Sequence, residues 1–208
     1  MDTKYYTFFV YKKLLKMLEK RGYIIGECEK EIDFIEFCAM YEQEFINCAS
    51  NATDRIVLSV EKPDGKRMLI FFPKEEKVGI KPLKTYCEKM NQTGIDRAMI
   101  VYAKTITPHA KQLIQENIGQ KVKYSFEYFS FQQLMNDIIE HTYVPNHRKM
   151  SQEEKELFLK TRSLKNENLP KLSIHDPISQ YYQFSIGDVI EISRCGDAGP
   201  YKEYRIVG

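Results

Sequence analysis

The sequence predicts an α/β protein, α+β overall, composed of two domains. Strand-like and helix-like segments alternate between residues 55 and 130, which is typical of a mixed sheet with helices packed on its faces. A second group of turn and strand signals follows from residue 169 onward. Between the two groups, residues 142–150 interrupt the helical pattern, and Ser151-Gln152-Glu153-Glu154 restarts a helix as a capping box. We therefore place the domains at residues 1–142 and 143–208.

The N-terminal domain is expected to open with two helices. Residues 2–21 form an amphipathic pattern that ends at Gly22, with apolar side chains at helical spacing at Tyr5, Phe8, Phe9, Leu15 and Leu18. A second helix is predicted over residues 31–45. Its candidate buried residues are Ile32, Ile35, Phe37, Cys38 and Phe45.

A hairpin, followed by three helices that alternate with two strands, completes this domain. Residues 55–60 and 67–72 are predicted strands joined by the turn Pro63-Asp64-Gly65, where Pro sets φ and Gly supplies a positive φ. The remaining predicted elements are a helix at 83–90, a strand at 98–102, a helix beginning at Thr107-Pro108, a strand at 122–129 and a helix from Ser130.

The C-terminal domain has its own local signals. Asp176 is a favourable N-cap and Pro177 suits the first helical position, so a short helix carrying Tyr181 and Tyr182 is expected. Gly187 is expected to end the loop that connects this helix to an apolar strand. A turn near residues 196–200 and the alternating residues that follow predict a closing β-hairpin, with Tyr201, Tyr204, Ile206 and Val207 on its second strand.

Composition excludes several classes of protein. The chain has 208 residues, 43% of them hydrophobic and 12% aromatic, which is enough for packed cores. No apolar run approaches the ~18 to 20 residues that span a bilayer, and the N-terminus lacks the pattern of a signal peptide. The five cysteines include no C-x-x-C pair, so we expect neither a zinc site nor a disulfide framework but a reducing intracellular compartment. No cofactor is expected.

Charge is unevenly distributed along the chain. Residues 19–61 have a net charge of −6 and residues 77–123 a net charge of +6, although the whole chain has only +2. A solvated face is the simpler interpretation of such a basic segment, and contact with nucleic-acid phosphates is the alternative.

The C-terminal motifs resemble those of one family. In order they are Val144-Pro145-x-His147, Leu169-Pro170, Asp176-Pro177, Tyr181-Tyr182, Gly187 before an apolar strand, and Tyr201-x-x-Tyr204-Arg205-x-Val207. They resemble the C-terminal domain of the fifth-largest subunit shared by eukaryotic DNA-directed RNA polymerases, a family that also has an archaeal member. Two departures are Gln183, where the family usually has Gly, and a hairpin turn between Arg194 and Tyr201 that is about one residue short.

The resemblance extends to the N-terminal domain. Residues 71–81, with Tyr86 downstream, and residues 106–111 are similar to two signature stretches of the eukaryotic protein's jaw domain, although Glu76 stands where the family often has Pro. This similarity implies a restriction-endonuclease-like fold. Because the archaeal member of the family lacks the jaw domain, the nearer relatives are expected to be eukaryotic or encoded by a large cytoplasmic DNA virus.

The resemblance implies a non-catalytic polymerase subunit with two interfaces. The N-terminal domain is expected to form part of the lower jaw near downstream double-stranded DNA, with Thr107, Pro108, His109 and Lys111 facing it. The C-terminal domain is expected to dock on the largest polymerase subunit, among other core subunits. The expected interface residues are Asp176, Pro177, Tyr181, Tyr182, Gly187, Tyr201, Tyr204 and Arg205. Neither a membrane nor a small-molecule substrate is an expected partner.

Two alternatives remain open from the sequence. The first is a free-standing nucleic-acid-processing enzyme of nuclease ancestry, which needs clustered carboxylates and a Lys on adjoining strands. Asp54 could begin such a site, but the strand at 67–72 has no acid-x-Lys pattern. The second is a detached regulatory paralogue that binds polymerase. The location is predicted to be the nucleus for a cellular protein, or the host cytoplasm and virion for a viral one.

Overall fold

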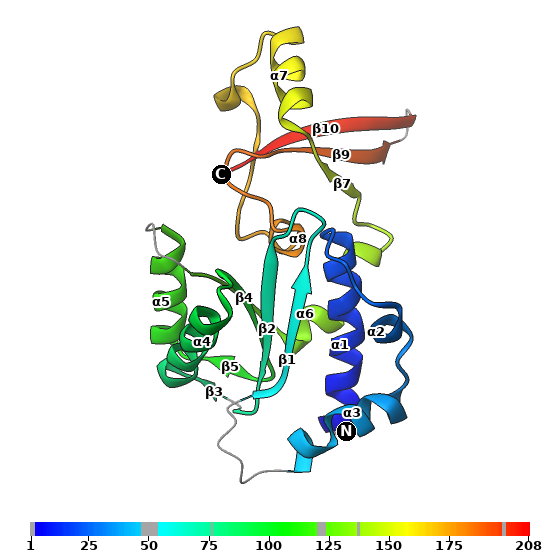
Figure 1. Cartoon of the computed structure of the whole chain (residues 1–208). Coiled ribbons are helices and arrows are strands. Elements are labelled where there is room, and N and C mark those ends of the chain that lie inside the picture. The colour runs from blue at the N-terminus through cyan, green and yellow to red at the C-terminus, as the bar shows by residue number, and fades with distance from the viewer. Residues whose placement is uncertain (1–2, 47–53, 76, 120–123, 137, 197–198) are drawn as a thin grey trace. The chain divides into compact units, whose positions relative to one another are not determined.

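The computed structural model describes residues 3–46, 54–75, 77–119, 124–136, 138–196 and 199–208 (Figure 1). The chain divides into two compact units, Met1–Asn136 and Asp137–Gly208. Each unit contains a four-stranded sheet, so the predicted mixed α/β class is confirmed. The division between the units falls at 136/137, and the sequence-predicted domain boundary lies at 142/143.

The first unit is built on a mixed sheet with the strand order β1-β2-β4-β6. Its strands are β1 (Asp54–Glu61), β2 (Arg67–Pro73), β4 (Arg97–Tyr102) and β6 (Ser125–Ser130). The first pair is antiparallel, and β4 lies parallel to both β2 and β6. Gly65 has φ +80° in the β1–β2 turn, as the predicted hairpin requires. The strand expected from residue 122 begins at Ser125, and residues 122 and 123 lie outside the described part of the chain.

Six helices belong to this unit's described residues. They are α1 (Thr3–Lys20), α2 (Glu27–Glu31), α3 (Phe34–Ile46), α4 (Ile80–Thr93), α5 (Pro108–Gly119) and α6 (Phe131–Met135). The helix expected at 31–45 is present as α3, which begins three residues later, at Phe34, whereas the short helix α2 was not predicted. Asp33 Oδ1 accepts from the Glu36 amide at 2.7 Å, and Glu36 Oε2 accepts from the Asp33 amide at 3.3 Å. This reciprocal cap starts a new helix at Phe34.

Helices cover both faces of the first sheet. Leu69, Phe71, Ile100 and Phe126 pack on one face against residues of α4 and α5. On the second face of the same strands, Ile70, Met99 and Phe129 are also buried, and the Phe72–Phe131 and Tyr6–Phe131 ring contacts join α1 and α6 to that face. Figure 1 shows α1 beside β1 and α4 with α5 on the other side.

The burial predicted for the first helices was only partly correct. Leu15 and Leu18 of α1 are buried, as expected, but Tyr5 is 49% and Phe9 39% exposed. In α3, Phe37 is buried whereas Ile35 is 76% exposed. Helical spacing identifies candidate faces, but the neighbouring elements decide how wide the buried stripe is. The side chain of Phe45 lies outside the described residues.

The second unit contains a sheet with the order β7-β9-β10-β8. Its strands are β7 (Asn146–Lys149), β9 (Val189–Gly196), β10 (Gly199–Val207) and β8 (Lys171–Leu172). Only β8 pairs in parallel, with the end of β10. The helices are α7 (Gln152–Thr161), α8 (Pro177–Tyr182) and the short 3₁₀ segments η1 (Ile138–Glu140) and η2 (Asn166–Asn168). The predicted capping box, Asp-Pro helix and closing hairpin are all present.

Strand alternation gives this sheet two different faces. Val189 and Ile206 pack with Met150, Leu169 and residues of α7, whereas Ile190, Ile192 and Val207 pack with Phe184 and residues of α8. We call these the α7 face and the α8 face. Directly paired residues share a face, so the pairing register assigns every residue of β7, β9 and β10 to one of them.

Candidate nucleic-acid and subunit interfaces

The start of α5 is held by a small parallel pair, β3 (Lys77–Val78) with β5 (Thr105–Ile106). The amide of Thr107 donates to the carbonyl oxygen of Val78 at 3.0 Å, which fixes the strand-to-helix turn. Thr107 Oγ1 accepts from the Ala110 amide at 3.3 Å and so acts as N-cap. Pro108 has no N–H, and the amide of His109 has no acceptor within the described residues. It is therefore available to an external acceptor.

All four residues expected to face DNA lie within this first turn. Pro108 and His109 are exposed, and Thr107 and Lys111 are half-buried. The Lys111 ammonium lies 5.9 Å from the ring centroid of Tyr128 on β6. This cation–π contact holds the ammonium over the Tyr128 ring. A free amide, a positive helix end and a nearby ammonium together suit a phosphate oxygen.

The strands of the first unit offer little to a hydrolytic metal site. Residues Met68 to Pro73 of β2 are all buried, and every one of their side chains is apolar. Among the residues that the structure describes, no group of three His, Cys, Asp or Glu side chains could hold a metal ion. The side chain of Asp54 lies outside them. Among the described helices, none combines the length and apolar character that a membrane crossing requires.

Several C-terminal motif residues maintain their own module. Asp176 Oδ1 accepts from the Ile178 amide at 2.8 Å, which caps α8, and Pro177 occupies its first position. Gly187 has φ +89°, its amide donates to Val207 at 2.8 Å, and its carbonyl accepts from Lys155 Nζ at 2.9 Å. These residues have structural roles that explain their place in the motif without any partner.

The four expected interface tyrosines do not form one patch. Tyr201 and Tyr204 are three residues apart on β10 and therefore lie on opposite faces of the sheet. Tyr204 packs on Phe158 of α7, with ring centroids 4.2 Å apart, and its hydroxyl donates to Glu191 at 3.4 Å. Tyr182 stacks on Phe184 at 5.4 Å and packs against the core of the α8 face. Tyr181 makes an edge contact with Tyr182.

Tyr201 is the exposed member of this set, with 53% of its surface accessible. It lies on the α8 face in register with Arg194. On the same face, Glu203 accepts from Arg194 at 2.8 Å and from Arg205 at 2.7 Å. Hydrogen bonding by Arg205 is the main reason that the pKa of Glu203 lies below its usual range. An exposed aromatic ring beside two guanidinium groups is a typical anchor composition for a protein interface.

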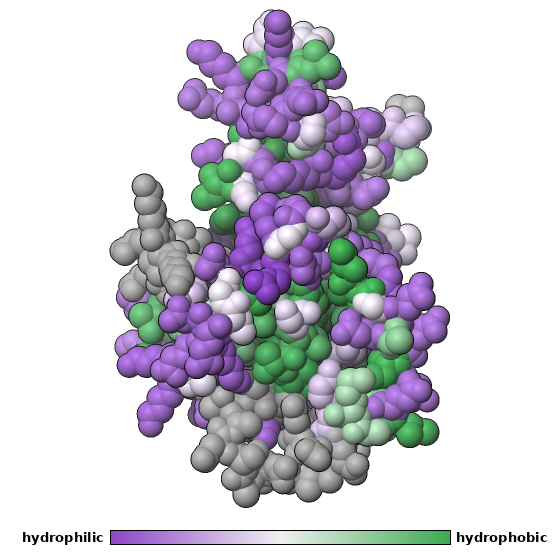
Figure 2. All heavy atoms as spheres, in the orientation of Figure 1, coloured by the Kyte–Doolittle hydropathy of each residue, from purple (hydrophilic) through white to green (hydrophobic). Residues whose placement is uncertain are grey.

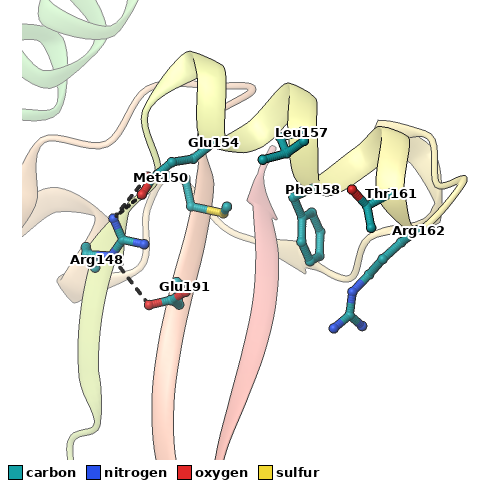
Figure 3. Close-up of a pocket in the computed structure, with 8 residues that line it drawn as sticks. All are labelled: Arg148, Met150, Glu154, Leu157, Phe158, Thr161, Arg162 and Glu191. Carbon is teal, nitrogen blue, oxygen red and sulfur yellow. Dashed lines mark hydrogen bonds and ion pairs between the residues drawn. The ribbon is translucent and has the colours of Figure 1, made fainter.

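The α7 face carries a groove that the motifs did not reveal. Its volume is about 350 Å³, and it is lined by Arg148, Met150, Glu154, Leu157, Phe158, Thr161, Arg162 and Glu191 (Figure 3). Figure 3 shows Arg148 between the two acids: its guanidinium lies 3.0 Å from Glu154 and 3.4 Å from Glu191. Leu157 is 67% exposed at the rim, although the visible surface over α7 is mostly hydrophilic (Figure 2).

Glu191 is the centre of a polar network on this face. Burial alone would raise the pKa of Glu191, but hydrogen bonds from Lys202 and Arg148 outweigh that effect and hold the pKa below its usual range. The Lys202 ammonium lies 3.1 Å from Glu191 Oε1. The sequence signal for this network was the position of Glu191 inside the otherwise apolar run 189–192. The sequence does not show which residues pair with Glu191, because they lie on β7 and β10.

Comparison with known proteins identifies the family. The family model described as "RNA polymerase Rpb5, N-terminal domain" matches residues 2–90 of this chain. The model described as "RNA polymerase Rpb5, C-terminal domain" matches residues 136–207. The chain belongs to the Rpb5 family. Similar curated proteins are DNA-directed RNA polymerases I, II, and III subunit RPABC1 of Caenorhabditis elegans, 34% identical over 198 residues, and its counterpart of Dictyostelium discoideum, 34% identical over 196 residues. These alignments cover 94% of this chain and 92% and 93% of the two relatives.

These similarities confirm the sequence-based assignment of this Rpb5-family chain. They confirm the prediction of a non-catalytic RNA polymerase subunit and give no support to a free-standing nuclease or a detached regulatory paralogue. The matched ranges fall in both compact units, so the assignment does not depend on one domain alone.

Proposed function

We propose that this Rpb5-family chain forms part of the lower jaw of a DNA-directed RNA polymerase and docks on its largest subunit. In this proposal the first unit approaches downstream double-stranded DNA and the second unit provides the attachment. Nucleotide addition belongs to other subunits. The observation that carries the proposal is the family match in both units, supported by 34% identity over 94% of the chain to a shared polymerase subunit.

The α5 N-terminus is the proposed DNA-facing element. The exposed Pro108 and His109, the unused His109 amide and the Lys111 ammonium support contact with the phosphate backbone rather than with base edges. We further propose that the first unit has a restriction-endonuclease-like fold that serves as a scaffold. Its support is the mixed sheet that begins with an antiparallel hairpin and has helices on both faces.

The α8 face around Tyr201 is the proposed docking surface for the largest subunit. Its support is the exposed Tyr201 ring and the adjacent guanidinium groups of Arg194 and Arg205. Tyr204, Asp176 and Gly187 would contribute indirectly, by holding the hairpin and α8 in place. The relatives named as subunits of polymerases I, II and III support a nuclear location. Action in the host cytoplasm and virion remains the proposal for a virus-encoded copy.

Copurification tests this proposal. The tagged chain, expressed in its native source, should recover the largest polymerase subunit in stoichiometric amount. Tyr201→Ala should reduce that recovery without changing the melting temperature of the purified chain. Tyr143→Ala is the matched control, because Tyr143 is 90% exposed in the same unit but belongs to no proposed interface. Recovery of the chain without any polymerase subunit would overturn the proposed function. Full recovery with Tyr201→Ala would remove this residue from the docking surface.

A further inference from the structure

A cluster of charged side chains lies at the opposite end of the first sheet from the α5 N-terminus. Arg21 and Tyr23 follow α1, Lys62 lies in the β1–β2 turn, Arg97 begins β4, and Glu127 lies on β6. We call these five residues the Tyr23 cluster. Because β4 and β6 are parallel and the turn precedes β2, the cluster borders the edge where the parallel strands start. The strand-to-helix turn at Thr107 follows the other ends.

Tyr23 is the point on which these side chains converge. The Lys62 ammonium lies 4.7 Å from the centroid of the Tyr23 ring, and the Arg97 guanidinium is near enough to the Tyr23 hydroxyl to oppose the rise in its pKa that burial causes. That hydroxyl also lies 3.8 Å from Met68 Sδ. The ring itself is only 4% exposed. Tyr23 therefore holds an ammonium and a guanidinium close together at a partly buried position.

Arg21 supplies a third cation to the cluster. Its guanidinium lies 2.9 Å from Glu127 Oε2, and its side chain is 1% exposed compared with 21% for Glu127. The guanidinium carbon also lies 5.5 Å from the ring centroid of Phe129. These contacts connect the end of α1 to β6 and fix the position of the positive charge.

The cluster has more positive than negative charge. It contains three cations and one carboxylate, Glu127, which forms its ion pair with Arg21 at 2.9 Å. The pKa of Lys62 is lowered by burial first and then by the charges of Arg97 and Arg21, while Asp64 opposes this shift. Asp64 itself pairs with Lys66 at 2.8 Å. The cations thus repel one another where solvent screening is incomplete, so an anion bound among them would relieve that repulsion.

The composition of the cluster indicates which anion would fit. Lys62 and Arg97 are half-buried, so each retains surface that a ligand can reach. A guanidinium offers several N–H donors in a fork, and an ammonium adds a point charge; the two together match the oxygens of a phosphoryl group. A singly charged carboxylate would neutralise less of the excess charge.

We propose that the Tyr23 cluster is a binding site for a phosphoryl group. Arg97 and Lys62 contact the ligand directly. The buried Arg21, which is held by Glu127, adds positive charge without contacting the ligand. The ligand is either a free phosphate ester or pyrophosphate, or a phosphate of a nucleic-acid backbone. The site is independent of the α5 N-terminus and does not depend on the proposed docking surface.

Binding measurements on the full-length chain test the site. Titration calorimetry with pyrophosphate, with a nucleoside triphosphate and with a short DNA duplex separates the two sources of phosphate. We expect saturable binding that Arg97→Gln and Lys62→Gln each weaken about tenfold, since each removes a charge-assisted contact. Lys66→Gln is the control, because Lys66 lies in the same turn but is exposed and paired with Asp64.

The possible outcomes separate the ligand source from the existence of the site. Binding of pyrophosphate that depends on Arg97 and Lys62 supports a small phosphorylated ligand. Duplex binding with the same dependence, but no binding of pyrophosphate, supports a nucleic-acid phosphate. Absence of saturable binding to all three probes overturns the proposal, as does equal weakening by Lys66→Gln, which would indicate a diffuse field. Thermal unfolding of each variant checks folding, and the half-exposed Lys62 provides the test if Arg97→Gln does not fold.

Discussion

The α5 N-terminus and the C-terminal Tyr-x-x-Tyr-Arg segment show how differently a short motif maps onto a surface. At α5 the four expected contact residues occupy one helical turn, and the first three lie together around the cap. On β10 a spacing of three residues places Tyr201 and Tyr204 on opposite faces. One becomes an exposed ring, and the other packs on Phe158. Spacing in a motif therefore indicates a shared surface only once the period of the element is known.

The largest expected effect tests the division between these two tyrosines. Tyr204→Ala should destabilise the folded chain by about 2 kcal/mol, because it removes a half-buried ring and its contact with Phe158. Tyr201→Ala should change stability by less than about 0.5 kcal/mol, as for other exposed positions. Chemical denaturation followed by circular dichroism measures both. Equal effects of the two variants would contradict the assignment of the residues to different faces.

A second prediction concerns the departure from the family pattern at Gln183. This residue ends α8 in the left-handed conformation, with φ +58°, which a residue with a Cβ adopts at a cost. Gln183→Gly should therefore raise the free energy of unfolding by about 1 kcal/mol or less. Gln180→Gly within α8 is the matched control and should lower it by about 1 kcal/mol. A melting temperature reduced by Gln183→Gly would show that other contacts of this side chain outweigh the backbone strain.

A smaller effect is expected at the α5 N-terminus. Lys111→Glu should leave polymerase assembly intact and shorten the lifetime of open complexes. The contact that is lost should contribute about 1 kcal/mol or less. Heparin-challenged half-lives measured across a salt series would show the effect most clearly at low salt. Lys111→Met retains the apolar stem over Tyr128 and should give an intermediate lifetime. Half-lives identical to the wild type at low salt would place this segment outside the DNA path.

The smallest predicted effect is a pH dependence of the second unit. Burial lowers the pKa of His147 below 6.5, with additional lowering by Arg194 and Arg205 and opposition from the carbonyl of Pro145 and from Asp176. Because the unfolded chain then binds more protons, this contribution to stability is complete above pH 6.5 and is lost as the pH falls through the folded-state pKa.

Melting temperatures at pH 7 and pH 5.5 check this sign. The wild type should lose more stability on acidification than His147→Asn, which lacks the titrating group. The carboxylates of Glu191 and Glu203 have lowered pKa values and titrate at lower pH in both proteins, so they cancel in the comparison. An equal loss in the two proteins would contradict the lowered pKa of His147.

Local signals predicted most of the elements because their causes are local. The helix start at Ser130, the capping box at Ser151, the Asp176-Pro177 start and the Gly65 turn all appear where the sequence placed them. The short helix α2 and the later start of α3 were missed, although Asp33 and Glu36 carried the signal of a reciprocal cap. Apolar periodicity was stronger over this range, and it obscured the break.

By itself, the amino-acid sequence determined the two α/β modules, most of their longer strands and helices, and membership of the Rpb5 family. Each follows from caps, turns, periodicity and motif order, which act over a few residues. Only the tertiary structure decided which tyrosine is exposed, how Arg148 and Lys202 surround Glu191, and that Arg21, Lys62 and Arg97 converge on Tyr23. The partners in these clusters come from strands and helices far apart in the chain. Their proximity depends on strand order, on pairing register and on which faces are covered, and none of these is encoded in a short window of sequence.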